Sequence, residues 1–272
     1  MEVRRTTQLT NDFVDEYIPE PVLLDHVSHS QLSLWDSCPK KWQYSYVERL
    51  RESSSGNLIL GSCYHETLEE NFKKKLILGH DLDFDICADF FDTIWNKSLG
   101  NAWETNWGNS SPDALKDIGI TLIGKYLDDV APAIIPQFVE RWMEKVINGT
   151  KFVIRIDLID MNNIVIDHKT AAKSYSQTDV DKNVQASASA FALGHPIVFH
   201  NHVAVKTKTP QIQIVKTYRT HADIDWWYKK ASAILAHMKT GYAPPREDSW
   251  LCSEQYCGFY DLCRKDLARS SK

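Results

Sequence analysis

Three side chains near the middle of the sequence have the types and the spacing for metal-assisted chemistry. Asp157 lies in KFVIRIDLID, Asp167 follows in NIVIDHK, and Lys169 stands two positions after Asp167. Residues two apart on a strand project from the same face. The two carboxylates, together with the backbone carbonyl of His168, could hold a hard divalent cation such as Mg²⁺, with Lys169 beside a bound water. A water activated by such a cation can attack a phosphate.

The same residues allow a simpler interpretation, in which a strand merely ends in surface charges. The apolar neighbours of both aspartates argue against it, because acids at the ends of buried strands are unfavourable unless they are paired or metal-bound. His65, in GSCYHE, would join the site only if its predicted helix packs against these strands, and would otherwise be a structural histidine. The apolar neighbours are Ile154, Ile156 and Leu158 around Asp157, and Ile164 and Ile166 before Asp167.

Four of the six cysteines form a second constellation. Cys38 lies in DSCPKKW, whereas Cys252, Cys257 and Cys263 lie in WLCSEQYCGFYDLC with four and five residues between them. Their proline, glycine and aromatic neighbours show no apolar periodicity, and four thiolates could bind a 4Fe–4S cluster or structural Zn²⁺. Zinc sites more often contain closely paired cysteines. The alternative is a set of unrelated thiols.

The pattern of secondary-structure elements that must position these residues predicts an α/β fold. Segments rich in β-branched residues and bounded by turn residues indicate strands, and apolar residues at 3.6-residue spacing indicate helices. Cys63 and Cys87 fall on the apolar faces of two such helices, so we expect them to be core thiols. The strands are expected at 151–160, 163–169, 197–206 and 211–219, and the helices from Ser30 and Gly61 and over 84–97, 113–130, 179–193 and 222–239.

The net charge of −5 is unevenly distributed along the chain. Residues 1–25 carry two basic and six acidic side chains, residues 81–129 carry three and ten, and the remainder sums to +6. Because binding depends on the local potential within about one Debye length, roughly 10 Å, this distribution does not exclude a polyanionic ligand. A hydrophobic fraction of 43% and a charged fraction of 25% exclude a disordered or collagen-like chain.

Two absences in the sequence bear on its location. There is no run of about 18 apolar residues, and MEVRRTTQLTNDF lacks the apolar core of a secretory signal. We therefore expect a cytoplasmic protein of a bacterium or a phage-infected cell, with no membrane partner. In such a compartment six cysteines favour metal binding or catalysis over disulfides.

Six segments in a fixed order resemble RecB-like nucleases of the PD-(D/E)XK superfamily. They are SHSQLSLWDSCPKKWQYSYV, GSCYHETLE, IRIDLID, VIDHKTAAK, QASASAFALG and the three-cysteine tail. The resemblance runs from about residue 28 to 265 and is strongest to the iron–sulfur branch, which includes the AddB nuclease domain, CRISPR-associated RecB-like exonucleases and related phage exonucleases. It implies a restriction-endonuclease-like core with a central mixed β-sheet flanked by helices, an N-terminal helical part, and a cysteine-rich tail that closes an iron–sulfur site.

The resemblance also implies roles for individual residues. Lys169 would orient the nucleophilic water, and Gln185 would support the site beside this lysine. The implied ligands of Mg²⁺ or Mn²⁺ are His65, Asp157, Asp167 and the carbonyl of His168, and those of a 4Fe–4S cluster, with Zn²⁺ as the alternative, are Cys38, Cys252, Cys257 and Cys263. Glu140, in FVERW, matches an acidic position often found before the hairpin.

The implied activity is that of a metal-dependent DNA exonuclease on single strands or DNA ends, in recombination, repair, or phage or CRISPR DNA processing. Two departures keep a second hypothesis open. Ile154 stands where the family usually has glycine, and Ser189 stands where it has the tyrosine of a QxxxY motif. These positions favour a nuclease-like DNA-binding or adaptor module with weak or no cleavage.

Basic and aromatic residues alternate in CPKKWQYSYVERLR, residues 38–51. Phosphates could bind Lys40 and Lys41 while bases stack on Trp42 and Tyr44, as in single-strand-binding proteins. The alternative is an amphipathic helix whose aromatic residues lie in the core. Lys173 is a further candidate for DNA contact.

We expect a single nuclease domain over residues 28–265. Its expected parts are an acidic helical insertion or cap at 81–130, a catalytic α/β core at 130–240 and a cysteine-rich tail at 241–265, preceded by a flexible acidic arm at 1–27 and followed by a basic tail at 266–272. The expected partners are DNA, a helicase, recombinase or integrase, and possible further copies of the chain.

Overall fold

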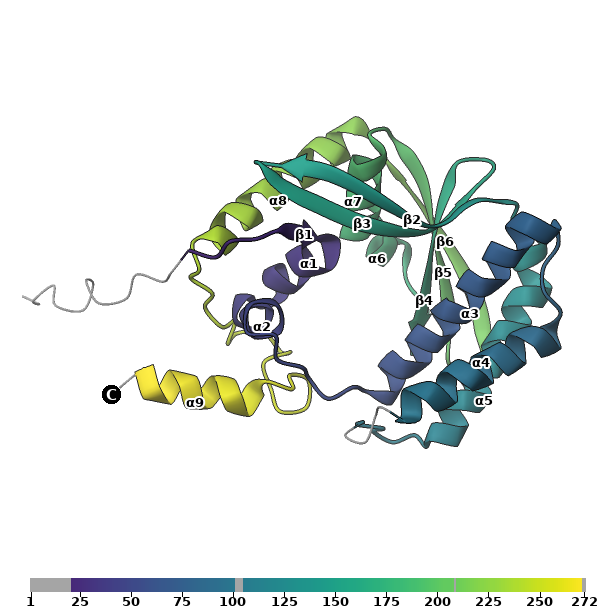
Figure 1. The fold of residues 1–272 in the computed structure, drawn as a ribbon, viewed down its shortest axis with the longest axis horizontal. Helices are drawn as coiled ribbons and strands as arrows, with labels where there is room; N and C mark the ends of the chain where they lie inside the picture. The colour runs from purple at the N-terminus through teal and green to yellow at the C-terminus, as the bar shows by residue number, and fades with distance from the viewer. Residues whose placement is uncertain (1–20, 101–104, 208, 271–272) are drawn as a thin grey trace, which may run out of the picture.

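Strands form a mixed sheet at the centre of the molecule, with helices on both faces (Figure 1). This computed structural model describes residues 21–100, 105–207 and 209–270, so the expectations for residues 1–20 of the arm and for the last two residues of the tail lie outside the described part. The strands are β1 His26–Ser28, β2 Pro136–Ile147, β3 Thr150–Asp160, β4 Ile164–Ala171, β5 Ile197–Val205 and β6 Gln211–Arg219.

Strand β3 is the branch point of this sheet. Along one edge it pairs with β2, and along the other it pairs first with β1 at residues 151–153 and then with β4 at Leu158 and Ile159. Residues 154–157 lie between these two pairings, and we call this interval the fork. From β4 the sheet continues through β5 to β6. Asp157 therefore lies where β4 separates from β3.

Helices cover the two faces of the sheet as separate layers (Figure 1). Apolar residues of α3, α4 and α5 share one core with β3 and β4, whereas α1, α7 and α8 share two adjoining cores on the other face. The bounds are α1 His29–Ser37, α2 Pro39–Trp42, the π-helix η1 Gln43–Val47, α3 Gly56–Leu78, α4 Phe84–Gly100, α5 Pro112–Asp129, the 3₁₀-helix η2 Ala131–Ala133, α6 Gln177–Asp181, α7 Val184–Leu193, α8 His221–Lys239 and α9 Tyr260–Ser270.

The α/β class, the hairpin at Met161–Asn163 and the core positions of Cys63 and Cys87 agree with the sequence. Strand β2 was not predicted, because its side chains do not alternate between buried and exposed positions. The end of the expected arm also differs, since residues 26–28 form β1 and Val27 is fully buried. Similarly, the tail from Tyr260 is helical.

None of the helices in the described ranges is long and apolar enough to cross a membrane.

Candidate active site

His65 reaches the fork because α3 packs closely against β4. Ser55 caps the start of this helix by accepting the backbone N–H of Leu58. A Cβ atom at Gly61 would lie 3.1 Å from Oγ1 of Thr170 on β4, so a larger residue would push the helix away. As a result, Nε2 of His65 lies 2.9 Å from Oδ2 of Asp157. The packing condition for including His65 in the site is met.

At the fork, the side chain of Asp157 binds β4 where the backbone pairing between β3 and β4 has ended. Its Oδ2 atom accepts the backbone N–H of His168 at 3.0 Å, just beyond the last pairing of β3 with β4. The imidazole of His168 lies close as well, with Nδ1 3.9 Å from the same oxygen. The carboxylate of Asp157 therefore joins α3 to the middle of β4.

Asp167, Lys169 and Gln185 form a second group on the α7 side of β4. Nζ of Lys169 donates to Oδ1 of Asp167 at 2.9 Å and to Oε1 of Gln185 at 3.1 Å. Nε2 of Gln185 donates to the same Asp167 oxygen at 2.7 Å. The second oxygen, Oδ2 of Asp167, is buried without a hydrogen-bond partner among the described residues. This carboxylate therefore retains one free acceptor.

The start of α7 fixes the position of Gln185. The side chain of Asn183 accepts the backbone N–H groups of Gln185 and Ala186 and so caps the helix. The buried Arg219 donates to the carbonyl oxygen of Asn183 and to Oγ of Ser187, one turn later. Small buried residues along α7 also allow it to lie close to the sheet. These contacts hold Gln185 beside Lys169.

The two aspartates have opposite electrostatic environments. Burial opposes ionisation of Asp157, but the hydrogen bond and charge of His65 outweigh it and lower its pKa to about 2. Burial and the charge of Asp157 raise the pKa of Asp167 to about 6, although Lys169 opposes this shift. Burial also opposes protonation of Lys169, yet the charges of Asp167 and Asp157 raise its pKa. Carboxylates whose pKa values are pushed apart in this way are typical of active sites.

Glu140 lies closer to the side chains of this site than its position in the sequence indicated. It has a φ of 52° within β2, a conformation that is strained for a side chain with a Cβ atom, and its side chain is 7% exposed. Oε1 lies 3.6 Å from Nε2 of His65, and Oε2 lies 2.6 Å from Nε of Arg155. Burial and the charge of Asp157 raise its pKa to about 7. Arg155 was not predicted, because its partner Glu140 is distant in sequence.

A buried polar chain supports His168 from behind. The hydroxyl of Tyr126 on α5 lies 2.9 Å from Nε2 of His168 and 2.7 Å from Nδ1 of His202 on β5. Burial lowers the pKa of His168 to about 4, so its imidazole is neutral near pH 7. Neither Tyr126 nor His202 was predicted, since these contacts join positions far apart in sequence.

Part of this site lines a cleft of about 1470 Å³, whereas Asp167, Glu140, Tyr126 and His202 lie outside its lining. The volume of the cleft exceeds the roughly 300–1,000 Å³ that is usual for small-molecule pockets. One end is lined by His65, Asp157, His168, Lys169 and Gln185, and the walls come from β1, α1, η1, the first half of α3, and β2. The fork thus lies in a cleft large enough for a polymer.

The predicted metal ligands are partly preassembled in the described residues. Two groups have ligand atoms within 4.8 Å of one another, namely His65 with Asp157 and His168, and His65 with Glu69 and Glu140. Asp167 belongs to neither group, and its Oδ1 accepts hydrogen bonds from Lys169 and Gln185. Its free Oδ2 and the adjacent Asp157 carboxylate provide the oxygen donors that Mg²⁺ and Mn²⁺ prefer, so the residues fit such a cation.

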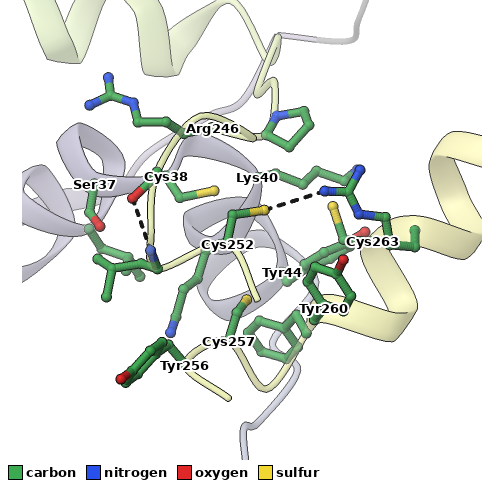
Figure 2. A pocket seen from close by; sticks show the side chains of 17 residues that line it. Ser37, Cys38, Lys40, Tyr44, Arg246, Cys252, Tyr256, Cys257, Tyr260 and Cys263 are labelled. Carbon is green, nitrogen blue, oxygen red and sulfur yellow. Dashed lines mark hydrogen bonds between the residues drawn. The ribbon is translucent and has the colours of Figure 1, made fainter. Parts of the chain in front are cut away.

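The four cysteines predicted to act together line one cavity of about 90 Å³ between α2 and the C-terminal tail. Figure 2 shows the sulfur atoms of Cys38, Cys252, Cys257 and Cys263 gathered around this space. All are free thiols, and Nη2 of Arg264 lies 3.6 Å from Sγ of Cys252. The fold therefore brings residue 38 to the tail as expected.

The predicted stacking residues Trp42 and Tyr44 are each only 1% exposed, so that prediction is wrong. They form part of the core because the aromatic face of residues 38–47 turns inward. Lys40 lies over the Tyr44 ring and Lys41 pairs with Glu52, and both line the cysteine cavity rather than the cleft. Lys173 is exposed but lies outside the residues that line the cleft.

Two solved structures match this chain in a structural comparison. A protein from Eubacterium rectale with an inferred exonuclease assignment is 13% identical, with a TM-score of 0.57 over 89% of this chain and 88% of the other. The protein SSO0001 is 16% identical, with a TM-score of 0.35 over 86% of this chain and 97% of the other. The first likeness shows a shared fold. No curated protein sequence matches the chain significantly.

A family model for the PD-(D/E)XK nuclease superfamily matches residues 26–264. This match includes β1, the fork, α7 and the cysteines of the tail. The mixed sheet flanked by helices agrees with it. The chain belongs to the PD-(D/E)XK nuclease superfamily.

Proposed function

We propose that this nuclease is a Mg²⁺- or Mn²⁺-dependent DNA exonuclease that acts on single strands or on DNA ends. The observation that carries the proposal is the convergence of His65, Asp157 and Lys169 from three elements in the lining of a large cleft, with the buried Asp167 directly behind Lys169. A structural ion-pair network would not need access to such a cleft.

The residues of the chain would divide the catalytic work between them. A bound Mg²⁺ or Mn²⁺ supplies Lewis-acid chemistry and an activated water. Asp157 and the free oxygen of Asp167 would hold the cation together with His65. The ammonium group of Lys169 would orient the attacking water and offset negative charge on the phosphate. Gln185 would keep that ammonium group in place.

The test is digestion of end-labelled single-stranded, duplex and circular DNA, with and without Mg²⁺ or Mn²⁺. We expect shortening of linear single strands or ends only when a cation is present. Asp167→Ala should abolish cleavage without unfolding the chain, and Asp36→Ala, on α1 outside the cleft, is the matched control. If Asp167→Ala cleaved DNA as fast as the wild type, the proposed nuclease site would be wrong.

A DNA-binding or adaptor module is the second candidate. Ser189 is 2% exposed on α7, so it cannot take over a DNA contact from the family's tyrosine. In the same experiment an adaptor would retard the DNA on a gel without shortening it. Docking to a helicase, recombinase or integrase would then be its main role.

We propose that the cysteine cavity holds a 4Fe–4S cluster. Zinc sites more often contain closely paired cysteines, whereas Cys252, Cys257 and Cys263 have four and five residues between them. Together with Cys38 these thiols line one cavity, which supports a single cluster bound by all four. Iron and acid-labile sulfide in anaerobically purified protein would support this, whereas stoichiometric zinc alone would overturn it.

A further inference from the structure

An exposed aromatic side chain on β2 lies in the cleft, where the buried Trp42 and Tyr44 cannot act. Trp142 is 66% exposed and lines the same cleft as His65 and Asp157. Large aromatic rings usually bury most of their surface, and an exposed one in a concave site indicates a binding surface. Trp142 therefore offers an aromatic surface to a ligand that occupies the cleft.

The register of the sheet connects Trp142 to the catalytic end of the cleft. Its partner on β3 is Arg155, the residue that forms the 2.6 Å ion pair with Glu140. Glu140 in turn lies 3.6 Å from His65. A group that covers Trp142 would consequently lie beside the residues expected to bind the cation.

A second exposed aromatic side chain lies on another wall of this cleft. Tyr46 on η1 is 43% exposed, and Leu58 at the start of α3 is exposed beside it in the lining. These two residues and Trp142 give the cleft apolar surface on elements that are separate in sequence. Flat rings on the walls suit flat, partly apolar ligand groups.

The charges in the cleft favour unpaired bases over a duplex. Its cations are already partly neutralised, because Lys151 lies 3.3 Å from Glu144 and Lys169 lies 2.9 Å from Asp167. Glu66 and Glu69 also line the cleft, so two phosphate backbones at once would meet repulsion. Base stacking on an aromatic ring contributes to single-strand binding without regard to sequence.

We propose that Trp142 stacks against an unpaired base of the nucleic-acid strand next to the scissile phosphate. It thereby gives the enzyme its preference for single-stranded substrates or frayed ends. This inference rests on the proposed nuclease function for its link to cleavage, but the stacking contact itself can be measured by binding alone. The occupant is a single strand of nucleic acid.

The test compares the full-length chain with Trp142→Ala, Trp142→Phe and Trp226→Ala. Trp226 is the matched control, because it is 55% exposed on α8 and outside the cleft lining. Trp142→Ala should raise KM for a single-stranded oligonucleotide about 5- to 150-fold, the range expected for one stacked base. Trp142→Phe should restore part of this loss, and Trp226→Ala should leave KM unchanged.

Two substrates separate stacking from a structural effect. A fully abasic oligonucleotide has neither a base nor any other aromatic ring, so Trp142→Ala should bind and cleave it as the wild type does. An oligonucleotide series with one abasic position at a time should contain one position where wild type and Trp142→Ala have equal KM. An equal loss on the baseless substrate, or no loss on DNA, would overturn the proposal.

Binding of the same oligonucleotides in Ca²⁺, followed by fluorescence anisotropy, keeps the two proposals distinguishable. If the wild type does not cleave but binds single strands in a Trp142-dependent way, the nuclease function fails and the stacking surface stands. If it cleaves and Trp142→Ala has no effect on KM or binding, the function stands and the stacking surface fails.

Discussion

The fork and the cysteine cavity are the two regions of this chain that carry chemistry, and they are held together differently. At the fork, the side chains already bind one another, with Asp157 on His65 and Asp167 on Lys169 and Gln185. In the cysteine cavity, the sulfurs are free thiols without a disulfide. The functional side chains of the fork are therefore held by one another, whereas the walls of the cavity are joined by neighbouring contacts, such as Tyr44 with Asp266 and Gly258 with Glu52, to which a bound group would add.

The origin of the difference lies in chain connectivity. Asp157, Asp167 and Lys169 are placed by adjacent antiparallel strands joined by a short turn. The cavity instead joins Cys38 to residues more than 200 positions later, so closing it restricts a long loop. Changes at the fork should thus affect activity, and changes at the cavity should affect stability.

Asp157→Asn is expected to have the largest effect on activity. The amide removes the charge that holds His65 and that would bind the cation, so kcat/KM should fall at least about 100-fold. The midpoint of thermal unfolding should stay near that of the wild type, because the amide can still accept the N–H of His168. Parallel assays of cleavage and unfolding measure this. If Asp157→Asn strongly lowered the midpoint of thermal unfolding but left kcat/KM unchanged, the proposal that the fork serves activity and the cavity serves stability would be wrong.

Cys252→Ser should show the opposite behaviour. Loss of one ligand should release the bound group and lower Tm by about 5–10 °C, because metal-binding energy is folding energy. Activity per folded molecule should remain near the wild-type value. Cys63→Ser, at a core thiol outside the cavity, separates loss of the bound group from ordinary core damage. Only the cavity variant should lose iron and sulfide.

Gln185→Ala should reduce kcat about 10- to 100-fold with little change in KM, the range usual for a residue that orients a catalytic group. The reason is that Lys169 keeps its bond to Asp167 but loses the amide that fixes its direction. Gln177→Ala, on the neighbouring α6, is a suitable control. An equal fall in kcat for both variants would indicate a general effect of helix packing.

The pH dependence of stability should give the smallest effect, a few degrees in Tm of the metal-free protein. Asp167 and Glu140 have pKa values raised from 3.8 to about 6 and from 4.5 to about 7. Their protonated forms favour the folded state, so the stability that these two groups contribute at low pH should be lost as pH rises from about 4 to 7, whereas the lowered pKa values of His168 and His202 act in the opposite direction. Asp157 acts oppositely, since its pKa is lowered and its contribution is lost only below pH 3.8.

Differential scanning fluorimetry between pH 4 and 8 with a chelator measures this loss, and Glu140→Gln should reduce it. Added Mg²⁺ should stabilise the protein most at the upper end of this range, where the carboxylates are ionised. A Tm difference between wild type and Glu140→Gln that does not change between pH 4 and 7 without metal would contradict the assigned environment of Glu140.

The strongest local patterns were sufficient for much of the fold and of the site. The β3–β4 hairpin, α3 to α5, α7 and α8 follow from periodicity and turn residues, and the spacing of Asp167 and Lys169 placed them on one strand face. Strand β2 could not be found in this way, because its exposed charges obscure the alternation. Glu140 was underestimated for the same reason, since its importance comes from a left-handed backbone and from burial against α3.

The aromatic residues separate what the sequence determines from what only the tertiary structure determines. The sequence by itself determined the catalytic residue types, their spacing and the four cysteines, because strand geometry and ligand chemistry are local properties. Only the tertiary structure decided that Trp42 and Tyr44 are buried and that Trp142 faces the cleft. Which face of an aromatic segment meets solvent depends on the elements packed against it, and those contacts join β1, α3 and the tail across most of the chain.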